Sequence, residues 1–425
     1  MAPPARTSPL TARAELEKNG KCETIAPVRA LLLENLAPQA TQILEAAGIA
    51  VENHVGAMDE DELIAELQGV QLLGIRSKTQ LTERVMAACP DLIAVGAFSI
   101  GTNQIDLAAA ARRGIAAFNA PFSNTRSVVE MAVSEMISLT RRLPDHNRNL
   151  HNGVWSKSAA GAHEIRGRTL GIVGYGNIGS QLSVIAEALG MNVIFYDSAE
   201  KLALGNATRM SSLEALLAQA DIVTLHVDGR SGNSGFFGRE QFAAMKQGAL
   251  FLNLSRGFIV DLEALKAGLE NGSIGGAAVD VFPDEPKKTG DPFSSPLQNM
   301  PNVILTPHIG GSTEEAQRDI GIFVATRLRD YVFHASTSLS VNLPNLSLDQ
   351  VQGSHRVAHL HENIPGVLAA VNQVFAAHNV NIDAQLLGTR GELGYVVTDV
   401  AAGIDDDAVA ALSSMPGTVR LRVLS

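Results

Sequence analysis

Short apolar runs alternate along the chain with segments whose apolar positions have helical spacing, starting at Val28. The runs VRALLL, VQLLGIRS, LIAVGAF and IAAFNAP predict strands over 28–33, 70–77, 92–98 and 115–121. The intervening segments predict helices over 39–48, 81–90 and 105–114. Gly48 and Pro90 stand where two of these helices are expected to end. Strands that alternate with helices of this length indicate βαβ units and a parallel sheet.

A second series of the same kind follows a long helical pattern. The segment TRSVVEMAVSEMISLTRRL predicts one helix over 125–143, and the stretch 151–168 has no periodicity and is expected to be irregular. Strands and helices then alternate again from TLGIV to the strand NVILTP at 302–307. The sequence therefore predicts an α/β fold with two Rossmann-like, doubly wound parallel sheets.

The C-terminal part follows another order. It predicts strands over 356–361, 380–388, 393–400 and 418–425, and helices over 365–379 and 405–415. The order βαββαβ is that of a ferredoxin-like domain. We therefore expect a flexible tail (1–25), two α/β domains (26–120 with 312–345, and 121–311) and a small third domain (346–425), with a linker over 342–354 in which Gly353 is a candidate hinge.

Composition excludes several classes of protein. The 425 residues are 46% hydrophobic and 18% charged, which is typical of folded domains. The formal net charge of -11 argues against a nucleic-acid surface, and no apolar stretch is long enough to cross a membrane. Cys22 and Cys89 have neither metal-binding spacing nor a disulfide framework, which favours a cytoplasmic protein without a metal. The N-terminal residues lack the apolar core of a secretory signal, so a flexible tail is favoured over a transit peptide.

The strongest motif is GIVGYGNIGSQL, which has G-x-G-x-x-G spacing between an apolar strand and a helix predicted over 180–189. Its glycines allow a tight turn, close approach of the backbone to a pyrophosphate, and close packing of helix on strand. The next strand ends on Asp197, whose carboxylate can accept hydrogen bonds from ribose hydroxyls and disfavours a 2′-phosphate. The motif thus predicts NAD rather than NADP, bound by Gly174, Tyr175, Gly176, Asn177, Ile178, Gly179 and Asp197.

Three polar residues follow later strands of this series. Arg256 comes after LFLNLS, Glu285 lies in the turn after GGAAVDV, and His308 follows NVILTP. The carboxyl ends of parallel strands share one edge of a sheet, where ligands bind. Dehydrogenation of a hydroxy acid needs a proton acceptor, which a histidine with a neighbouring carboxylate can supply, and a cation for the substrate carboxylate, which arginine supplies with two donors. Alone, each of these residues could equally be a packed ring, a surface ion-pair partner or a solvated acid.

A further group of polar residues lies at the end of a strand of the first series. Arg76, Ser77 and Lys78 follow the strand at 70–77, and Asn124 stands at the start of the helix over 125–143. Cations, a hydroxyl group and the amides of a helix start suit an anion such as a phosphate. The alternative is a solvated turn with a capping asparagine.

Together, GYGNIG with Asp197, NLSRG, DVFPDEP and TPHIGGST resemble the D-isomer-specific 2-hydroxyacid dehydrogenases. The resemblance implies that Arg256, Glu285 and His308 are the catalytic residues, and that Asp280 and His308 also contact NAD. The stretches GIRSKT, GTNQID and NAPFSNTRSV resemble those members that oxidise 3-phosphoglycerate. This implies substrate contacts by Arg76, Ser77, Lys78, Asn124 and Arg256. Lys78 departs from the family pattern, because it keeps a charge without the two-donor geometry of arginine.

The C-terminal βαββαβ unit is similar to an ACT regulatory domain. Its segments HENIPGVL and HNVNIDAQ resemble effector-binding segments, which implies that His361, Asn363 and Asn381 bind L-serine at a subunit interface. A domain that only mediates oligomerisation is the alternative. The resemblance also implies a cytoplasmic homotetramer that oxidises 3-phospho-D-glycerate to 3-phosphohydroxypyruvate with NAD, the first step of phosphorylated serine biosynthesis, under feedback inhibition by L-serine. Two alternatives stay open: a dehydrogenase for another D-2-hydroxy acid, such as glycerate or 2-hydroxyglutarate, and an NAD-binding interaction module.

Overall fold

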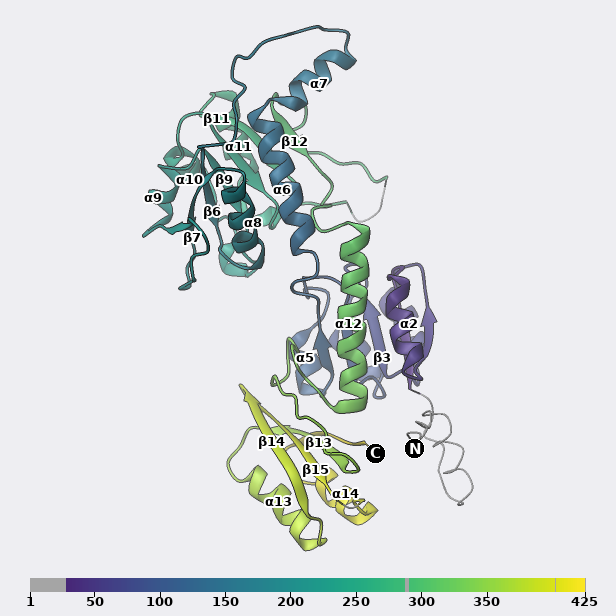
Figure 1. The fold of residues 1–425 in the computed structure, drawn as a ribbon. Helices are drawn as coiled ribbons and strands as arrows, with labels where there is room; N and C mark the ends of the chain where they lie inside the picture. The colour runs from purple at the N-terminus through teal and green to yellow at the C-terminus, as the bar shows by residue number, and fades with distance from the viewer. Residues whose placement is uncertain (1–27, 287–289, 402, 425) are drawn as a thin grey trace, which may run out of the picture.

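The computed structural model describes residues 28–286, 290–401 and 403–424, so the predicted tail (1–25) with Cys22 lies outside the described residues. Three sheets form the framework: a five-stranded parallel sheet, a seven-stranded parallel sheet and a four-stranded antiparallel sheet. They lie in three successive lobes, with the four-stranded sheet at one end of the molecule (Figure 1). The predicted α/β fold with two parallel sheets and a small third unit is confirmed.

The five-stranded sheet has the order β2-β1-β3-β4-β5. Its strands are β1 (Arg29–Leu32), β2 (Ala50–Asn53), β3 (Leu72–Ile75), β4 (Ala94–Ala97) and β5 (Ala116–Phe118). Its helices are α2 (Pro38–Ala46), α3 (Glu60–Glu66), α4 (Glu83–Ala88), α5 (Leu107–Arg112) and α12 (Glu314–His334). The four predicted strands and three predicted helices are confirmed. The sequence analysis missed β2 and α3, because an exposed edge strand reading AVEN and an acidic helix carry little apolar signal.

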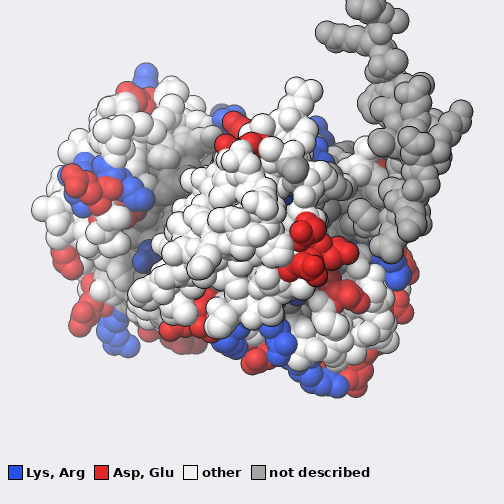
Figure 2. Space-filling model, turned by 90° about the horizontal axis from the view of Figure 1, so that it is seen from below, with Lys and Arg blue, Asp and Glu red and all other residues white. Residues whose placement is uncertain are grey.

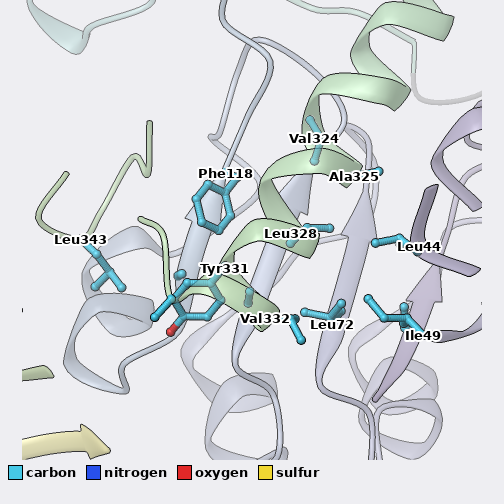
Figure 3. Packing of buried hydrophobic residues seen from close by; sticks show 14 of the residues in the cluster. Leu44, Ile49, Leu72, Phe118, Val324, Ala325, Leu328, Tyr331, Val332 and Leu343 are labelled. Carbon is cyan, nitrogen blue, oxygen red and sulfur yellow. The ribbon is translucent and has the colours of Figure 1, made fainter. Parts of the chain in front are cut away.

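Helix α12 covers one face of the five-stranded sheet, although it follows the second sheet in the chain (Figure 1). Val324 and Leu328 pack towards β3 and β4, and Tyr331 lies against Phe118 of β5 with ring centroids 5.9 Å apart (Figure 3). Added methyl groups on Gly96 would meet Val324 at 2.5 Å, so the helix lies directly on the strand. Burial of this apolar face holds α12 in place, so that its first residue, Glu314, lies shortly after the loop with His308.

The seven-stranded sheet has the order β12-β11-β10-β9-β6-β7-β8. Its strands are β6 (Thr169–Val173), β7 (Asn192–Tyr196), β8 (Thr208–Arg209), β9 (Ile222–Leu225), β10 (Ala249–Asn253), β11 (Ile274–Val279) and β12 (Val303–Leu305). Helices α6 (Thr125–Thr140) and α8 (Asn177–Ala188) cover one face, and α9 (Leu213–Leu217), α10 (Arg239–Ala244) and α11 (Leu262–Glu270) cover the other. Two short 3-10 turns, η1 (Ser231–Asn233) and η2 (Gly257–Ile259), complete this part.

The helix predicted over 125–143 is confirmed, but it ends three residues earlier, at Thr140. The chain forms α6 and then a second helix, α7 (Leu143–His151). Arg142 between them has a φ of 55°, in the left-handed region, and Pro144 lies in the first turn of α7. Proline has no N–H to donate within a helix but fits the first turn of one. A new helix therefore begins here instead of α6 continuing. The irregular stretch therefore begins after His151.

The four-stranded sheet has the order β14-β15-β13-β16, the ferredoxin-like arrangement that was predicted. Its strands are β13 (His355–Glu362), β14 (Ile382–Arg390), β15 (Leu393–Val400) and β16 (Thr418–Leu424). Helices α13 (Val367–Ala377) and α14 (Asp406–Ser413) pack on one face around Val371, Phe375 and Leu412. Every element predicted for this unit is confirmed within the described residues.

The last turn of α12 is capped by side chains of the four-stranded sheet. Arg422 donates to the carbonyl oxygens of Tyr331 and Val332, at 3.0 and 2.7 Å. Arg356 donates to His334 O at 2.7 Å, and Tyr395 donates to Ala335 O at 2.9 Å. Arg356 also forms a fully buried, two-donor ion pair with Asp399. These bonds supply donors to the carbonyl groups of the helix end, of which Tyr331 O also accepts from the Ala335 N–H at 3.1 Å.

Charges are dispersed on the face that carries the four-stranded sheet. Lys and Arg lie there in small separate groups among Asp and Glu, without a continuous basic surface (Figure 2). No helix in the described ranges is long and apolar enough to cross a membrane. Cys89 is a free, buried cysteine.

Candidate functional site

The glycine-rich turn joins β6 to α8 and leaves space above its second glycine. Gly174 has a φ of 93°, and a Cβ there would meet His226 O at 2.6 Å. A Cβ on Gly179 would meet Gly174 O at 2.3 Å, whereas a Cβ on Gly176 would meet nothing within 4 Å. Gly176 is also the N-cap of α8 and provides no side-chain cap, so N–H groups of the first turn stay free. The turn thus fits a pyrophosphate, and the helix starts earlier than the predicted residue 180.

Asp197 follows β7 and lies against the same turn. Its carboxylate accepts hydrogen bonds from the N–H groups of Tyr175 and Ala199, each at 2.8 Å. A cleft of about 510 Å³ beside the turn is lined by Gly176, Asn177, Ile178, the loop after β9 and Arg256. This cleft also has Gly101 and Asn103 of the five-stranded part on its wall, so it opens between the two parallel sheets.

His308 and Glu285 form a direct pair at the carboxyl ends of two neighbouring strands, β12 and β11. His308 Nδ1 lies 2.8 Å from Glu285 Oε2. A carboxylate can only accept, so Nδ1–H is the donor and Nε2 is left for another partner. Glu285 Oε1 in turn accepts from the Phe282 N–H at 3.1 Å, which holds the carboxylate in its turn.

The pair shifts the titration of both members. The hydrogen bond to Glu285 raises the pKa of His308, and the charges of Glu285 and Asp280 add to this, while burial acts in the opposite direction. Burial by itself raises the pKa of Glu285, but the hydrogen bonds from His308 and Phe282 and the charges of His308 and Arg256 outweigh it and hold that pKa low. The arrangement therefore favours an imidazolium beside a carboxylate.

Asp280 organises the loop that carries His308. Its buried carboxylate accepts hydrogen bonds from Thr306 Oγ1 at 2.7 Å and from the N–H groups of Ile309 and Gly310, each at 2.8 Å. The His308 N–H donates to Asp280 O at 2.8 Å. These bonds support the left-handed backbone of His308, whose φ is 55°. A direct contact of Asp280 with the cofactor stays a prediction, and its observed partners all belong to the loop.

Arg256 follows β10, next to the strands that carry the pair. Its pKa is lowered by burial, against which the charges of Glu285 and Asp228 act. Asn253, at the end of β10, shapes the loop: it donates to Arg256 O at 3.1 Å and accepts from the N–H and Oγ of Ser255. The sequence analysis missed Asn253, although an amide at a strand end inside NLSRG was a usable signal.

The predicted substrate residues lie in more than one cavity. Lys78 lines a cavity of about 680 Å³ together with Glu285 and His308. Arg256 lines the cleft beside the glycine turn, and Arg76 lines a third cleft of about 600 Å³ at the start of α12. The structure thus brings Lys78 into the cavity of the pair and does not bring Arg76 there.

A buried glutamate holds the loop with Arg76, Ser77 and Lys78. Glu34 accepts hydrogen bonds from the N–H groups of Ser77, Lys78 and Thr79, at 3.1, 3.1 and 2.9 Å. The sequence analysis missed this residue, because nothing near Glu34 in the chain marks a partner more than forty positions away. Glu34 therefore fixes the backbone that presents Lys78.

Asn124 is the N-cap of α6 and packs against the loop after His308. A Cβ on Gly311 would lie 2.1 Å from Asn124 Nδ2, so only glycine allows this approach. Asn124 Oδ1 is buried and has no hydrogen-bond partner among the described residues. An amide held in this way has an acceptor available for a ligand.

The three predicted effector residues are divided between two ends of the four-stranded sheet. His361 and Asn363 lie at one end, where His361 pairs with Gly394, and Asn381 precedes Ile382, which pairs with Val400 at the other end. Along β13 the two ends, at His355 and His361, are six residue steps apart, which is roughly 20 Å at about 3.3 Å per residue. One chain therefore does not bring the three side chains together.

Comparisons with known proteins agree with this architecture. Residues 133–310 match the model of the D-isomer specific 2-hydroxyacid dehydrogenase NAD binding domain, and residues 357–420 match an AHAS small subunit-like ACT domain. The chain is 48% identical to D-3-phosphoglycerate dehydrogenase of Escherichia coli K12, over 97% of this chain and all of the relative. It is 48% identical to the enzyme of the same name from Haemophilus influenzae, over 93% of this chain and 97% of that one.

A solved structure shares the fold over about seven tenths of this chain. The D-lactate dehydrogenase of Aquifex aeolicus, complexed with NAD and lactic acid, matches with a TM-score of 0.62 and 25% identity, over 71% of this chain and 95% of that chain. The two parallel sheets, the NAD binding domain and the ACT domain thus occur in known relatives, and nearly the full length aligns with the curated enzymes. The chain belongs to the D-3-phosphoglycerate dehydrogenases of the D-isomer specific 2-hydroxyacid dehydrogenase family.

Proposed function

We propose that this protein oxidises 3-phospho-D-glycerate to 3-phosphohydroxypyruvate with NAD, as the first step of phosphorylated serine biosynthesis. The observation that carries the proposal is the pair of His308 and Glu285, 2.8 Å apart, at the edge of the sheet that also presents Arg256 and the glycine turn. The likeness over nearly the whole chain to D-3-phosphoglycerate dehydrogenases supports the same substrate. The two parallel-sheet parts divide the work, with substrate binding by 26–120 and 312–345 and NAD binding by 121–311.

In the proposed mechanism, His308 Nε2 accepts the proton of the C2 hydroxyl group. Glu285 stabilises the resulting imidazolium and keeps its orientation through the bond to Nδ1. Arg256 binds the substrate carboxylate, for which its planar donors are suited. The nicotinamide, when bound, accepts the hydride from C2. In the reverse direction His308 donates the proton to the carbonyl oxygen.

The cofactor contacts are proposed from the turn and the end of β7. The N–H groups at the start of α8 would bind the pyrophosphate in the space above Gly176. Asp197 would accept hydrogen bonds from the adenosine ribose, and its charge would disfavour NADP. Tyr175, Asn177 and Ile178 belong to this contact through their place in the turn.

The direct test is a steady-state assay of the purified protein. We expect oxidation of NADH by phosphohydroxypyruvate, weaker activity with NADPH, and inhibition by L-serine. Activity with glycerate or 2-oxoglutarate and none with the phosphorylated substrates would replace this proposal by the alternative dehydrogenases. Absence of turnover with retained NADH binding would favour an interaction module.

Replacing Glu285 by glutamine should change the pH dependence of the reaction. The hydrogen bond to Glu285 raises the pKa of His308, so the base form is populated only at higher pH in the native protein. In Glu285→Gln the pKa of His308 falls, and the acidic limb of kcat/KM for phosphoglycerate oxidation moves to lower pH. Profiles of initial rate against pH for both proteins measure this shift. An unmoved acidic limb would contradict the proposed pairing.

Lys78 and Arg76 are both predicted to bind the substrate, but they line different cavities, so each is replaced separately and the two variants are compared. Lys78→Ala should raise the KM for 3-phosphoglycerate by about tenfold or more, as expected for loss of one charge-assisted bond, and should leave glycerate oxidation nearly unchanged. Arg76→Ala is predicted to act in the same direction. Arg84→Ala, which removes two exposed ion pairs from α4 to Glu60 and Asp61 of α3, is the control. Equal effects on the two substrates would favour a dehydrogenase for an unphosphorylated acid.

We also propose that L-serine binds the four-stranded sheet at an interface between two copies of the chain. Asn381 lies at the opposite end of the sheet from His361 and Asn363, so a shared site across two copies can unite them. His361 Nε2 is buried without a hydrogen-bond partner within the described chain, which leaves a polar atom available. A homotetramer is the assembly expected, in the cytoplasm. Sedimentation and serine titration of His361→Ala test the assembly and the site separately.

A further inference from the structure

A buried glutamate, Glu135, lies on α6, the helix that packs against β11 and β12. Its side chain is 4% exposed, and neither carboxyl oxygen has a hydrogen-bond partner among the described residues. Its neighbours on α6, Ala132, Met136 and Leu139, belong to an apolar cluster with strands β6, β10 and β11. A carboxyl group without partners in such surroundings is strongly disfavoured in its charged form.

The charged group that acts on Glu135 is Asp280. Helix α6 packs against β11, whose end carries Asp280, and against β12, which leads to His308. One turn before Glu135, Met131 lies 3.7 Å from a Cβ built on Gly310, the residue whose N–H donates to Asp280. Glu135 therefore lies on the helix that packs against the strands leading to this loop, close enough to Asp280 for its charge to act.

Other charges around α6 have partners elsewhere. Glu130 on α6 pairs with Arg126, Glu187 of α8 accepts from Asn206 N, and Asp145 of α7 pairs with Arg142. Strands β10 and β12 contribute no titratable side chain within their bounds. Among the described residues, Asp280 is the charged group that acts on Glu135. Burial, the larger cause, and the charge of Asp280 raise the pKa of Glu135 to about 8.

We propose that Glu135 is a positioning residue for His308: as a neutral acid it adds no second negative charge next to the Asp280 carboxylate that holds the loop. Ionisation of Glu135 would put a second negative charge beside Asp280, which the three donors Thr306, Ile309 and Gly310 cannot satisfy as well. The loop would then lose the arrangement that holds His308 against Glu285. The activity readout of this inference rests on the proposed function, but its stability readout does not.

The test compares Glu135→Gln with Glu130→Gln, a control on the same helix whose glutamate is exposed. In the native protein, phosphoglycerate oxidation should rise as His308 loses its proton and fall again above pH about 8, as Glu135 ionises. Glutamine is the neutral counterpart of the protonated acid, so Glu135→Gln should retain activity near neutral pH and lack the alkaline fall. Glu130→Gln should keep the native profile. An alkaline fall of the same size and position in Glu135→Gln would overturn the proposal.

Thermal unfolding provides the readout that needs no substrate. A folded-state pKa raised from 4.5 to about 8 contributes stability that is fully present below pH 4.5 and is lost as pH rises through about 8. The Tm of the native protein should therefore fall relative to that of Glu135→Gln across this window, and Glu130→Gln should show no such divergence. A constant Tm difference across the window would overturn the neutral state of Glu135, whatever the substrate of the enzyme. Divergence of Tm with unchanged pH–rate profiles would limit Glu135 to a structural role and also overturn the proposal.

Discussion

Replacing His308 by alanine should lower kcat by about 10²–10⁴-fold, the usual contribution of a positioned general acid or base. The substitution removes the proton acceptor and leaves the glycine turn and Arg256 in place. Loop geometry should survive, because Asp280 holds it through the backbone of Ile309 and Gly310 and through Thr306, and no bond from the imidazole to Asp280 is involved. NADH should therefore still bind. Steady-state rates and fluorescence titration with NADH measure the two properties.

His54 offers a matched control, because it is an exposed histidine beyond β2. His54→Ala should have native kinetics. If His308→Ala turned over within a few-fold of the native protein, the assignment of the proton acceptor would be wrong. If it lost NADH binding as well as turnover, the loop itself would have collapsed and the comparison would have to use His308→Gln.

Gly257→Ala should destabilise the protein by about 3 kcal/mol or more, the upper range for forcing extra atoms into a packed interior. A Cβ at this position would lie 1.9 Å from the carbonyl carbon of Phe282 and 2.1 Å from its oxygen. Both are backbone atoms of the turn that carries Glu285, so a rotamer change cannot relieve the overlap. The loops after β10 and β11 must separate, and with them Arg256 and Glu285. We expect a lower Tm, poor yield and, in any folded fraction, reduced turnover.

Gly56→Ala is the control for the general cost of this substitution, because a Cβ there meets nothing within 4 Å. Its Tm should stay within a degree or two of the native value, given that about 1 kcal/mol shifts the Tm of a domain of this size by about 2–4 °C. A Gly257→Ala protein with native Tm and native kinetics would show that the contact of the two loops is not needed to hold the site.

The sequence predicts the fold well where burial is continuous. The central strands of both parallel sheets are largely apolar runs because helices cover them on two faces, and such runs can be recognised from the sequence alone. Elements that depend on partners elsewhere are not visible in this way. Strand β2 is polar because it lies at an edge, and the break at Arg142 depends on one left-handed residue inside a good helical pattern.

The residues of the candidate site also fall into two groups, those that the sequence reveals and those that it does not. Residues whose chemistry is unusual for their position, such as His308 after an apolar strand, are found from the sequence. Residues that act through burial are not. Glu130 and Glu135 are two glutamates on one helix, and only the packing of α6 on its neighbours exposes the first and buries the second. Glu34 likewise acts through backbone groups more than forty positions away, and no local pattern records such a bond.

The capping of α12 by the four-stranded sheet couples the folding of two units that look separable in outline. Arg356, Tyr395 and Arg422 provide the donors for four carbonyl groups at the end of a helix that forms the core of another sheet. Unfolding of the C-terminal unit alone would remove these donors, leaving Tyr331 O with only the Ala335 N–H among the bonds described, and would expose the buried ring of Tyr331. The helix end that would fray belongs to α12, which is about 30 Å long and whose N-cap, Thr313, follows the loop that carries His308. The four-stranded sheet and the five-stranded sheet should therefore melt as one cooperative unit, and the C-terminal unit is a structural component of the enzyme rather than an independent attachment.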